Sequence, residues 1–288
     1  MFTMLDYEFM RNAFMAGGVV AILAGAAGYF LVLRGQAFAG HALSHVGFAG
    51  ATGAALVGAP PIFGMLAFMI AGAAAMGALG KRLRASDVAI GAVLALSLGL
   101  GMLFLHFFTA YASQVTALLF GNVLGVDGPM LRILGASAVL CLALLAFIAR
   151  PLLFATLQPE IAEAKGVSLR TVGILYLIIV AVATAASIQI VGVLLVFTLL
   201  VCPAAAAQKL TSRVGRGLLL SILLALAEAW LGIALAYATD WPVSFWISAL
   251  SVAVYLAAGG ARVMVFDVHR STRSGVSRRC TSCDGPNP

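Results

Sequence analysis

Long stretches without charge constrain the fold of this chain more than any other feature of its sequence. Arg11 and Arg34 enclose 22 uncharged residues, and Arg34 and Lys81 enclose 46. An α-helix needs about 20 apolar residues to cross the hydrocarbon core of a bilayer. The first stretch is therefore long enough for one membrane span, and the second is long enough for two.

The composition excludes a water-soluble protein. Only 27 of the 288 residues, 17 basic and 10 acidic, carry a formal charge, and 63% belong to the apolar set AVILMFWYC. Soluble domains carry charge on about a quarter of their residues. The chain has too little polar surface for a soluble enzyme, a nucleic-acid-binding protein or a disordered protein, so we expect it to contact membrane lipid.

The spacing of charges along the whole chain predicts an all-α polytopic membrane protein with nine spanning helices, or eight as the alternative. The predicted spans are 12–33, two within 35–80, and about 88–108, 131–149, 171–190, 192–208, 216–238 and 243–262. The mixed segment 109–128 is predicted to be interfacial or re-entrant. Residues 1–266 are predicted to form the transmembrane domain. The Arg-, Ser- and Gly-rich residues 267–288 are predicted to be a disordered tail.

Basic residues segregate between the two sides of the membrane that this path defines. Fifteen Lys and Arg residues fall on one side, whereas only Arg11 and Arg132 fall on the other. Cytoplasmic loops of membrane proteins carry the excess of basic residues. The pattern predicts an outside N-terminus, an odd number of spans and a cytoplasmic C-terminus.

Motifs of hydrolytic enzymes are missing from the sequence. The chain has no HExxH, no GxSxG and no complete P-loop, since Gly80-Lys81 is followed by Arg82 rather than by Ser or Thr. We therefore expect a transporter without an ATPase site of its own, rather than an enzyme.

Two histidines in the second predicted span form the most specific polar pattern. His41 and His45 are separated by four residues, which places both imidazoles on one face of a helix. Zinc and related divalent metals bind imidazole nitrogen in this arrangement. Small residues continue the same row at Ala37, Ala49 and Gly53, where another helix can approach closely. Metal binding is predicted; the alternative is that both histidines are satisfied by carbonyl groups of neighbouring helices or lie at the cytoplasmic interface.

Three further residues are weaker candidates for a transport pathway. Glu228 is the one acidic residue in the middle of a predicted span, where an ionisable group is costly and often functional. It is either a metal- or proton-binding group or the partner of a neighbouring helix. His106 and Asp240, near predicted outer ends of spans, either line a vestibule for metal or lie at the membrane interface.

A short helix is predicted between two spans, on the side with the basic residues. Pro159 suits its first turn, Glu160 and Glu163 complement the N-terminal dipole, and Gly166 is placed to end it. Ala162 lies between the two glutamates. A helix with such defined ends outside the membrane favours a docking surface for a cytoplasmic partner.

The order of these motifs resembles the membrane permeases of bacterial ABC importers for zinc, manganese or iron. The matching segments are Phe30–Arg34, Gly40–His45, Leu119–Asn122, Pro159–Gly166, and Val191–Val196 leading to Pro203–Ala207. The resemblance implies an inner-membrane permease homodimer with two cytoplasmic ABC ATPase subunits. It also implies delivery of metal by an extracytoplasmic binding protein, and it assigns 159–166 as the coupling helix that docks on the ATPase.

Two positions depart from the pattern of that family. His41 stands where the family usually has aspartate, whereas His45 matches. Imidazole suits zinc, and carboxylate oxygen suits manganese better, so the exchange favours zinc as the transported substrate. Gln158 stands where aspartate is common, which weakens the helix cap. The alternative function is a proton-coupled secondary metal transporter with Glu228 as its proton site.

Overall fold

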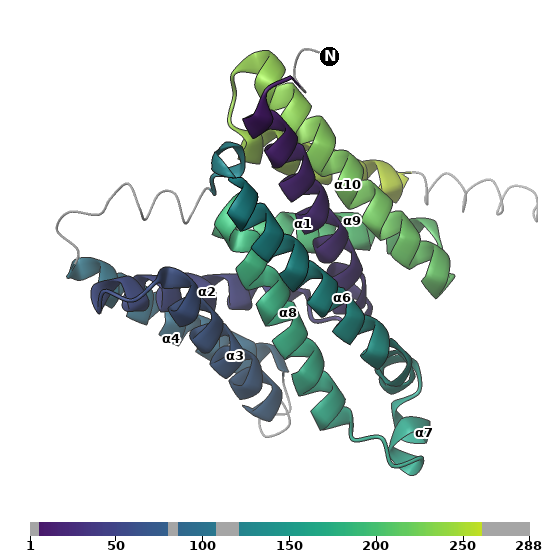
Figure 1. Ribbon diagram of the computed structural model, residues 1–288. Coiled ribbons are helices and arrows are strands. Elements are labelled where there is room, and N and C mark those ends of the chain that lie inside the picture. The colour runs from purple at the N-terminus through teal and green to yellow at the C-terminus, as the bar shows by residue number, and fades with distance from the viewer. Residues whose placement is uncertain (1–5, 80–85, 108–120, 261–288) are drawn as a thin grey trace, which may run out of the picture.

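The computed structural model describes residues 6–79, 86–107 and 121–260, and in these ranges it contains helices and no β-strand. Figure 1 shows their arrangement. The helices are α1 Glu8–Leu33, α2 Ala37–Leu56, α3 Pro61–Leu79, α4 Ser86–His106, α6 Gly128–Leu157, α7 Pro159–Ala164, α8 Leu169–Val191, α9 Val193–Leu210, α10 Val214–Thr239 and a last helix, Val243–Gly260. A 3₁₀ turn, Val123–Gly125, precedes α6. The predicted all-α fold is confirmed for the described part of the chain.

Seven of the described helices are long and apolar enough to cross a membrane, which makes this a multi-pass protein. They are α1, α3, α4, α6, α8, α10 and Val243–Gly260. The other two predicted spans are also helical, but α9 has a shorter apolar stretch and α2 carries polar side chains in a Gly- and Ala-rich sequence. The count of eight or nine spans and the orientation stay predictions. The tail 267–288 and most of the segment 109–128 lie outside the described residues.

The central helix of the bundle is α1, which packs against α6, α8, α9 and α10. Most of its residues are buried. Gly28 permits the closest of these approaches, because a Cβ at this position would collide with the carbonyl oxygen of Leu200 on α9. Other helices present large apolar side chains outward, such as Met102 on α4 and Phe147 on α6. Exposed apolar surface of this kind is expected where helices face lipid.

A second packed group consists of α2, α3 and α4, which lie together on one side of Figure 1. The backbones of α2 and α3 cross at Gly50 and Gly64, where a Cβ on either residue would collide with the carbonyl oxygen of the other. The group is joined to the rest of the bundle through contacts of α3 with α8 and of α2 with α9. These contacts fix the position of α2, which carries the histidine pair.

The helix α6 is longer than the span predicted to end at about residue 149. It passes through Arg150 and Pro151 and ends at Leu157. The proline removes one backbone donor, but the buried face of α6 continues beyond it through Leu152 and Ala155. Packing of this face explains why the helix does not end where the sequence suggested. Only Gln158 then separates α6 from α7.

Candidate functional site

The histidine pair lies on one face of α2, as its spacing predicted. The ring centroids of His41 and His45 are 4.8 Å apart, and the rings meet edge to face at 81°. Both side chains are half-buried. The two hydroxyl groups of α2 are satisfied within the helix, since Ser44 donates a hydrogen bond to the carbonyl oxygen of Gly40 at 3.2 Å and Thr52 donates to that of Ala49 at 3.0 Å. The two imidazoles are therefore the polar groups of α2 that are free to bind something outside the helix.

Aromatic side chains surround the first histidine. The centre of the Phe197 ring on α9 lies 4.8 Å from that of His41, and the centre of the Phe38 ring lies 6.5 Å from it. The Nδ1 atom of His41 is buried and has no hydrogen-bond partner. A buried polar atom without a partner is costly, so this nitrogen is a candidate ligand atom.

The described residues of one chain do not complete a metal site around this pair. Within the described ranges, no cluster of three or more His, Cys, Asp or Glu side chains is placed to hold a metal ion. His41 and His45 thus supply at most two ligands, whereas a tetrahedral zinc ion takes four. Any further His, Cys, Asp or Glu ligand would have to come from outside the described residues.

The small residues of α2 accommodate other helices of the same chain. A Cβ at Gly53 would contact the ring of Phe104 on α4, and Ala49 lies close to Gly101 of the same helix. The predicted close approach is therefore confirmed at these two positions, and the approaching helix is α4. Ala49 and Gly53 therefore pack against another helix of the same chain.

Glu228 occupies a separate, closed place between α10 and the last helix. Its side chain is only 2% exposed. The hydroxyl group of Ser251 donates a hydrogen bond of 2.5 Å to its Oε2 atom, and its Oε1 atom has no partner. The structure does not gather Glu228 with His41 and His45 into a metal-binding group.

The two candidates at the predicted outer ends of spans are exposed. His106 lies in the last turn of α4, where its ring contacts that of Phe107. Asp240 ends α10 in a left-handed backbone conformation with φ of 56°. It lines a cavity of about 480 Å³ together with Tyr237 and Trp241. Neither residue joins the histidine pair in a group of three possible ligands.

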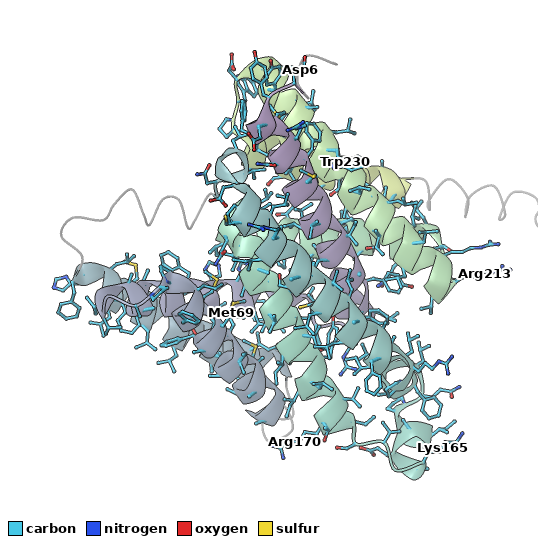
Figure 2. All side chains as sticks on the ribbon, in the orientation of Figure 1. Asp6, Met69, Lys165, Arg170, Arg213 and Trp230 are labelled. Atoms are coloured by element: carbon cyan, nitrogen blue, oxygen red, sulfur yellow. The ribbon has the colours of Figure 1, made fainter. Side chains whose placement is uncertain are left out.

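The short helix α7 has the boundaries that its sequence predicted. Pro159 begins it, and Gly166, with φ of 80°, follows its last turn and donates a backbone hydrogen bond to Glu163. Gln158 makes no side-chain cap, as expected from the missing aspartate. Ala162 is buried, whereas both glutamates are exposed. The helix thus offers an acidic outer face at one end of the molecule, where Figure 2 shows the neighbouring Lys165 far from Asp6.

Sequence reasoning did not find the role of Arg34, which joins the end of α1 to α6 and α8. Its Nη1 atom donates a hydrogen bond of 3.1 Å to Thr156 near the end of α6, and its Nε atom donates to Gln36 at 3.0 Å. Its guanidinium lies over the ring of Tyr176 on α8, whose hydroxyl donates to the carbonyl oxygen of Ala27. Burial lowers the pKa of the Arg34 guanidinium from its ordinary value. Its place at the end of a predicted span was the available signal.

Comparison with known proteins identifies the family. The profile of the ABC 3 transport family matches residues 6–260. The chain belongs to this family. The manganese transport system membrane protein MntC of Halalkalibacterium halodurans is 30% identical over 231 residues, which are 80% of this chain and 79% of the relative.

Two further proteins match this member of the ABC 3 transport family over most of its length. A membrane protein of Haemophilus influenzae named for iron transport is 29% identical over 257 residues, 88% of this chain and 94% of the relative. The solved structure of PsaBC from Streptococcus pneumoniae in complex with Fab has the same fold, with a TM-score of 0.77 at 24% identity. That match covers 88% of this chain and 92% of the other. The protein is thus a multi-pass protein of the bacterial inner membrane.

Proposed function

We propose that this chain is the membrane permease of an ATP-driven importer of divalent metal ions, with zinc preferred over manganese or iron. Family membership supports the transport role, and the names of the relatives support a metal substrate. The chain lacks the motifs of an ATPase, so cytoplasmic ABC subunits would supply hydrolysis. An extracytoplasmic binding protein would deliver the metal.

The observation that carries this proposal is the pair of adjoining imidazoles on α2. His41 and His45 present two nitrogen ligands side by side, and one buried nitrogen has no partner. In a two-fold permease dimer, a second copy would supply the same pair again. Four imidazoles from two chains would then provide the coordination number that zinc prefers. A transient site of this kind binds the transported substrate and releases it.

The preference for zinc rests on the residue at position 41. The two curated relatives described above are named for manganese and for iron, whereas this chain carries imidazole where the family usually has a carboxylate. Imidazole nitrogen favours zinc over manganese. The same fold with a different ligand would therefore select a different ion.

The exposed acidic face of α7 is the proposed contact with the ATPase subunits. This assignment places residues 159–166 in the cytoplasm, with an outside N-terminus and a cytoplasmic tail at 267–288 after a membrane domain over 1–266. It agrees with the excess of basic residues on that side. A proton-coupled carrier would need no such docking helix, and family membership favours the ATP-driven mechanism.

Reconstitution tests the proposal directly. The permease, its ATPase and its binding protein are incorporated into vesicles, and uptake of zinc, manganese and iron is measured with and without ATP. We expect ATP-dependent uptake with zinc as the best substrate. Uptake driven by a proton gradient without ATP would exclude the mechanism, and a clear preference for manganese would exclude the assignment of the metal.

A further inference from the structure

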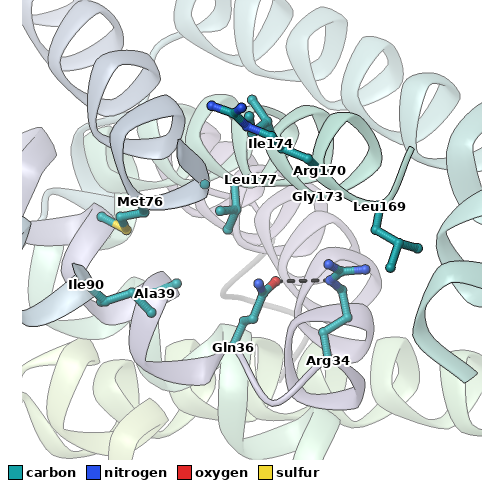
Figure 3. Close-up of a pocket in the computed structure, with 11 residues that line it drawn as sticks. Arg34, Gln36, Ala39, Met76, Ile90, Leu169, Arg170, Gly173, Ile174 and Leu177 are labelled. Atoms are coloured by element: carbon teal, nitrogen blue, oxygen red, sulfur yellow. Dashed lines mark hydrogen bonds between the residues drawn. The ribbon is translucent and has the colours of Figure 1, made fainter. Parts of the chain in front are cut away.

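A cavity of about 190 Å³ lies between helix ends, and neither His41 nor His45 is among the residues that line it. The end of α1, the start of α2, the end of α3, the start of α4 and the start of α8 enclose it (Figure 3). Polar or charged side chains form one part of its walls, and apolar side chains form the other. The residues that matter for its chemistry are Arg34, Gln36, Arg170, Met76, Ile90 and Leu177.

The polar part of this cavity is positively charged. Arg34 and Arg170 both line it, and among the described residues no aspartate or glutamate does. Within the described residues, Arg34 donates its hydrogen bonds to the neutral acceptors Gln36 and Thr156. A half-buried guanidinium without a carboxylate is an uncompensated charge, which an anionic ligand would stabilise. Phosphate oxygens match the fork of N–H donors on arginine.

The backbone of α8 leaves room beside the first arginine. A Cβ added at Gly173 would lie 3.3 Å from the Nη2 atom of Arg34. With glycine there, no side chain at this position of α8 occupies the space beside that nitrogen, and Gly173 itself lines the cavity. The Nη2 atom is also not the atom that donates to Gln36 or Thr156.

The remaining walls are apolar, and they lie deeper in the membrane spans. Arg170 stands in the first turn of α8, whereas Leu177 stands two turns further along the same face. Met76 lies near the end of α3, and Ile90 lies near the start of α4. A cavity with charged side chains at its rim and apolar side chains behind them suits an amphiphilic ligand better than a free ion.

We propose that this cavity binds an anionic phospholipid from the adjacent leaflet. Arg34 and Arg170 contact the headgroup phosphate, and the glycerol and upper acyl region packs against Met76, Ile90 and Leu177. Basic pockets between membrane helices on one side of a bilayer bind anionic headgroups in this manner. A bound lipid would join the ends of α1, α3, α4 and α8.

Lipid titration of the intact purified protein tests this site. Phosphatidylglycerol and phosphatidylcholine with the same acyl chains are added separately to the protein in detergent, and bound lipid is counted by native mass spectrometry. We expect one phosphatidylglycerol per chain with a raised melting temperature, and a much weaker effect of phosphatidylcholine. Inorganic phosphate is the second arm. If phosphate alone raises the melting temperature equally, the ligand is a soluble anion and the lipid assignment is wrong.

Matched variants separate a defined site from general surface charge. Arg170→Gln, at an exposed position that should not impair folding, should weaken phosphatidylglycerol binding about five- to tenfold. Arg213→Gln removes an exposed basic residue that does not line the cavity, and it should have no effect. Ile90→Trp should block the apolar part even if Arg34→Gln does not fold. Equal losses for Arg170→Gln and Arg213→Gln, or full binding by Ile90→Trp, would overturn the proposal.

Discussion

The histidine pair and Glu228 are both ionisable groups within the helical bundle, but their surroundings differ. His41 and His45 are half-buried on α2, face each other, and leave one ring nitrogen without a partner. Glu228 is almost fully buried, and Ser251 of the last helix donates a hydrogen bond to it. The low number of ionisable residues within the spans therefore does not show which of them bind a ligand and which stabilise the fold. The accessibility of each group and the identity of its partner distinguish the two roles.

The largest expected effect follows from removing the histidine pair. His41→Ala combined with His45→Ala should reduce ATP-dependent zinc uptake by roughly 100-fold or more, because even the outer partners of metal ligands change affinity 10- to 100-fold. Uptake by the reconstituted transporter and size-exclusion elution of the purified permease are measured together. His106→Ala, which removes an exposed histidine elsewhere, is the control. Normal uptake by the double variant would return the pair to a structural role.

Exchange of one ligand should change the substrate rather than abolish transport. His41→Asp restores the carboxylate that the family usually carries at this position. It should shift the ratio of zinc to manganese uptake by about tenfold toward manganese, since carboxylate oxygen suits the harder ion. Competition between the two metals in the same vesicles gives this ratio. An unchanged ratio would show that position 41 does not select the metal.

Truncation of the buried acid should affect stability more than transport. Glu228→Ala leaves a cavity and removes the acceptor of the Ser251 hydroxyl, which should lower the free energy of unfolding by about 1–3 kcal/mol. Thermal unfolding of the purified protein measures the loss. Uptake per folded molecule should stay near that of the unchanged protein. A selective loss of uptake without a loss of stability would place Glu228 in the pathway.

The smallest effects are expected from two conservative variants, one that removes the charge of Glu228 and one that removes the hydroxyl donor of Ser251. Glu228→Gln keeps an acceptor for Ser251, so uptake should change less than about twofold. Ser251→Ala should lower stability by about 0.6 kcal/mol, the average for a hydrogen bond between membrane helices. Initial uptake rates and melting temperatures are measured for both variants. Abolished uptake in Glu228→Gln would contradict the structural role and favour a proton-coupled step.

Local features of the fold were predictable from the sequence because they depend on neighbouring residues. Gaps between charges located the helices, and the spacing of His41 and His45 placed both rings on one face. Proline and glycine at Pro159 and Gly166 marked α7. Each of these signals is contained in one continuous segment of the chain, so no knowledge of the packing was needed.

Features that depend on packing between distant segments were not predictable. Arg34 bonds to Thr156, which lies 122 residues further along the chain. Phe197 reaches His41 because α9 packs against α2, and nothing near either residue indicates that contact. The continuation of α6 past Pro151 likewise depends on the buried positions of Leu152 and Ala155. In each case the deciding partner belongs to the tertiary structure.

The length of α6 has a mechanical consequence. Its 30 residues span about 45 Å at 1.5 Å per residue, whereas the hydrocarbon core is about 30 Å thick. The excess length is met by a tilt of α6 or by an end that lies outside the hydrocarbon core, and α7 follows one residue beyond that end. The hydrogen bond between Thr156 and Arg34 lies close to this end and connects it to the end of α1. A displacement of α7 is therefore expected to move the ends of α6 and α1 together, because no long loop separates α7 from α6.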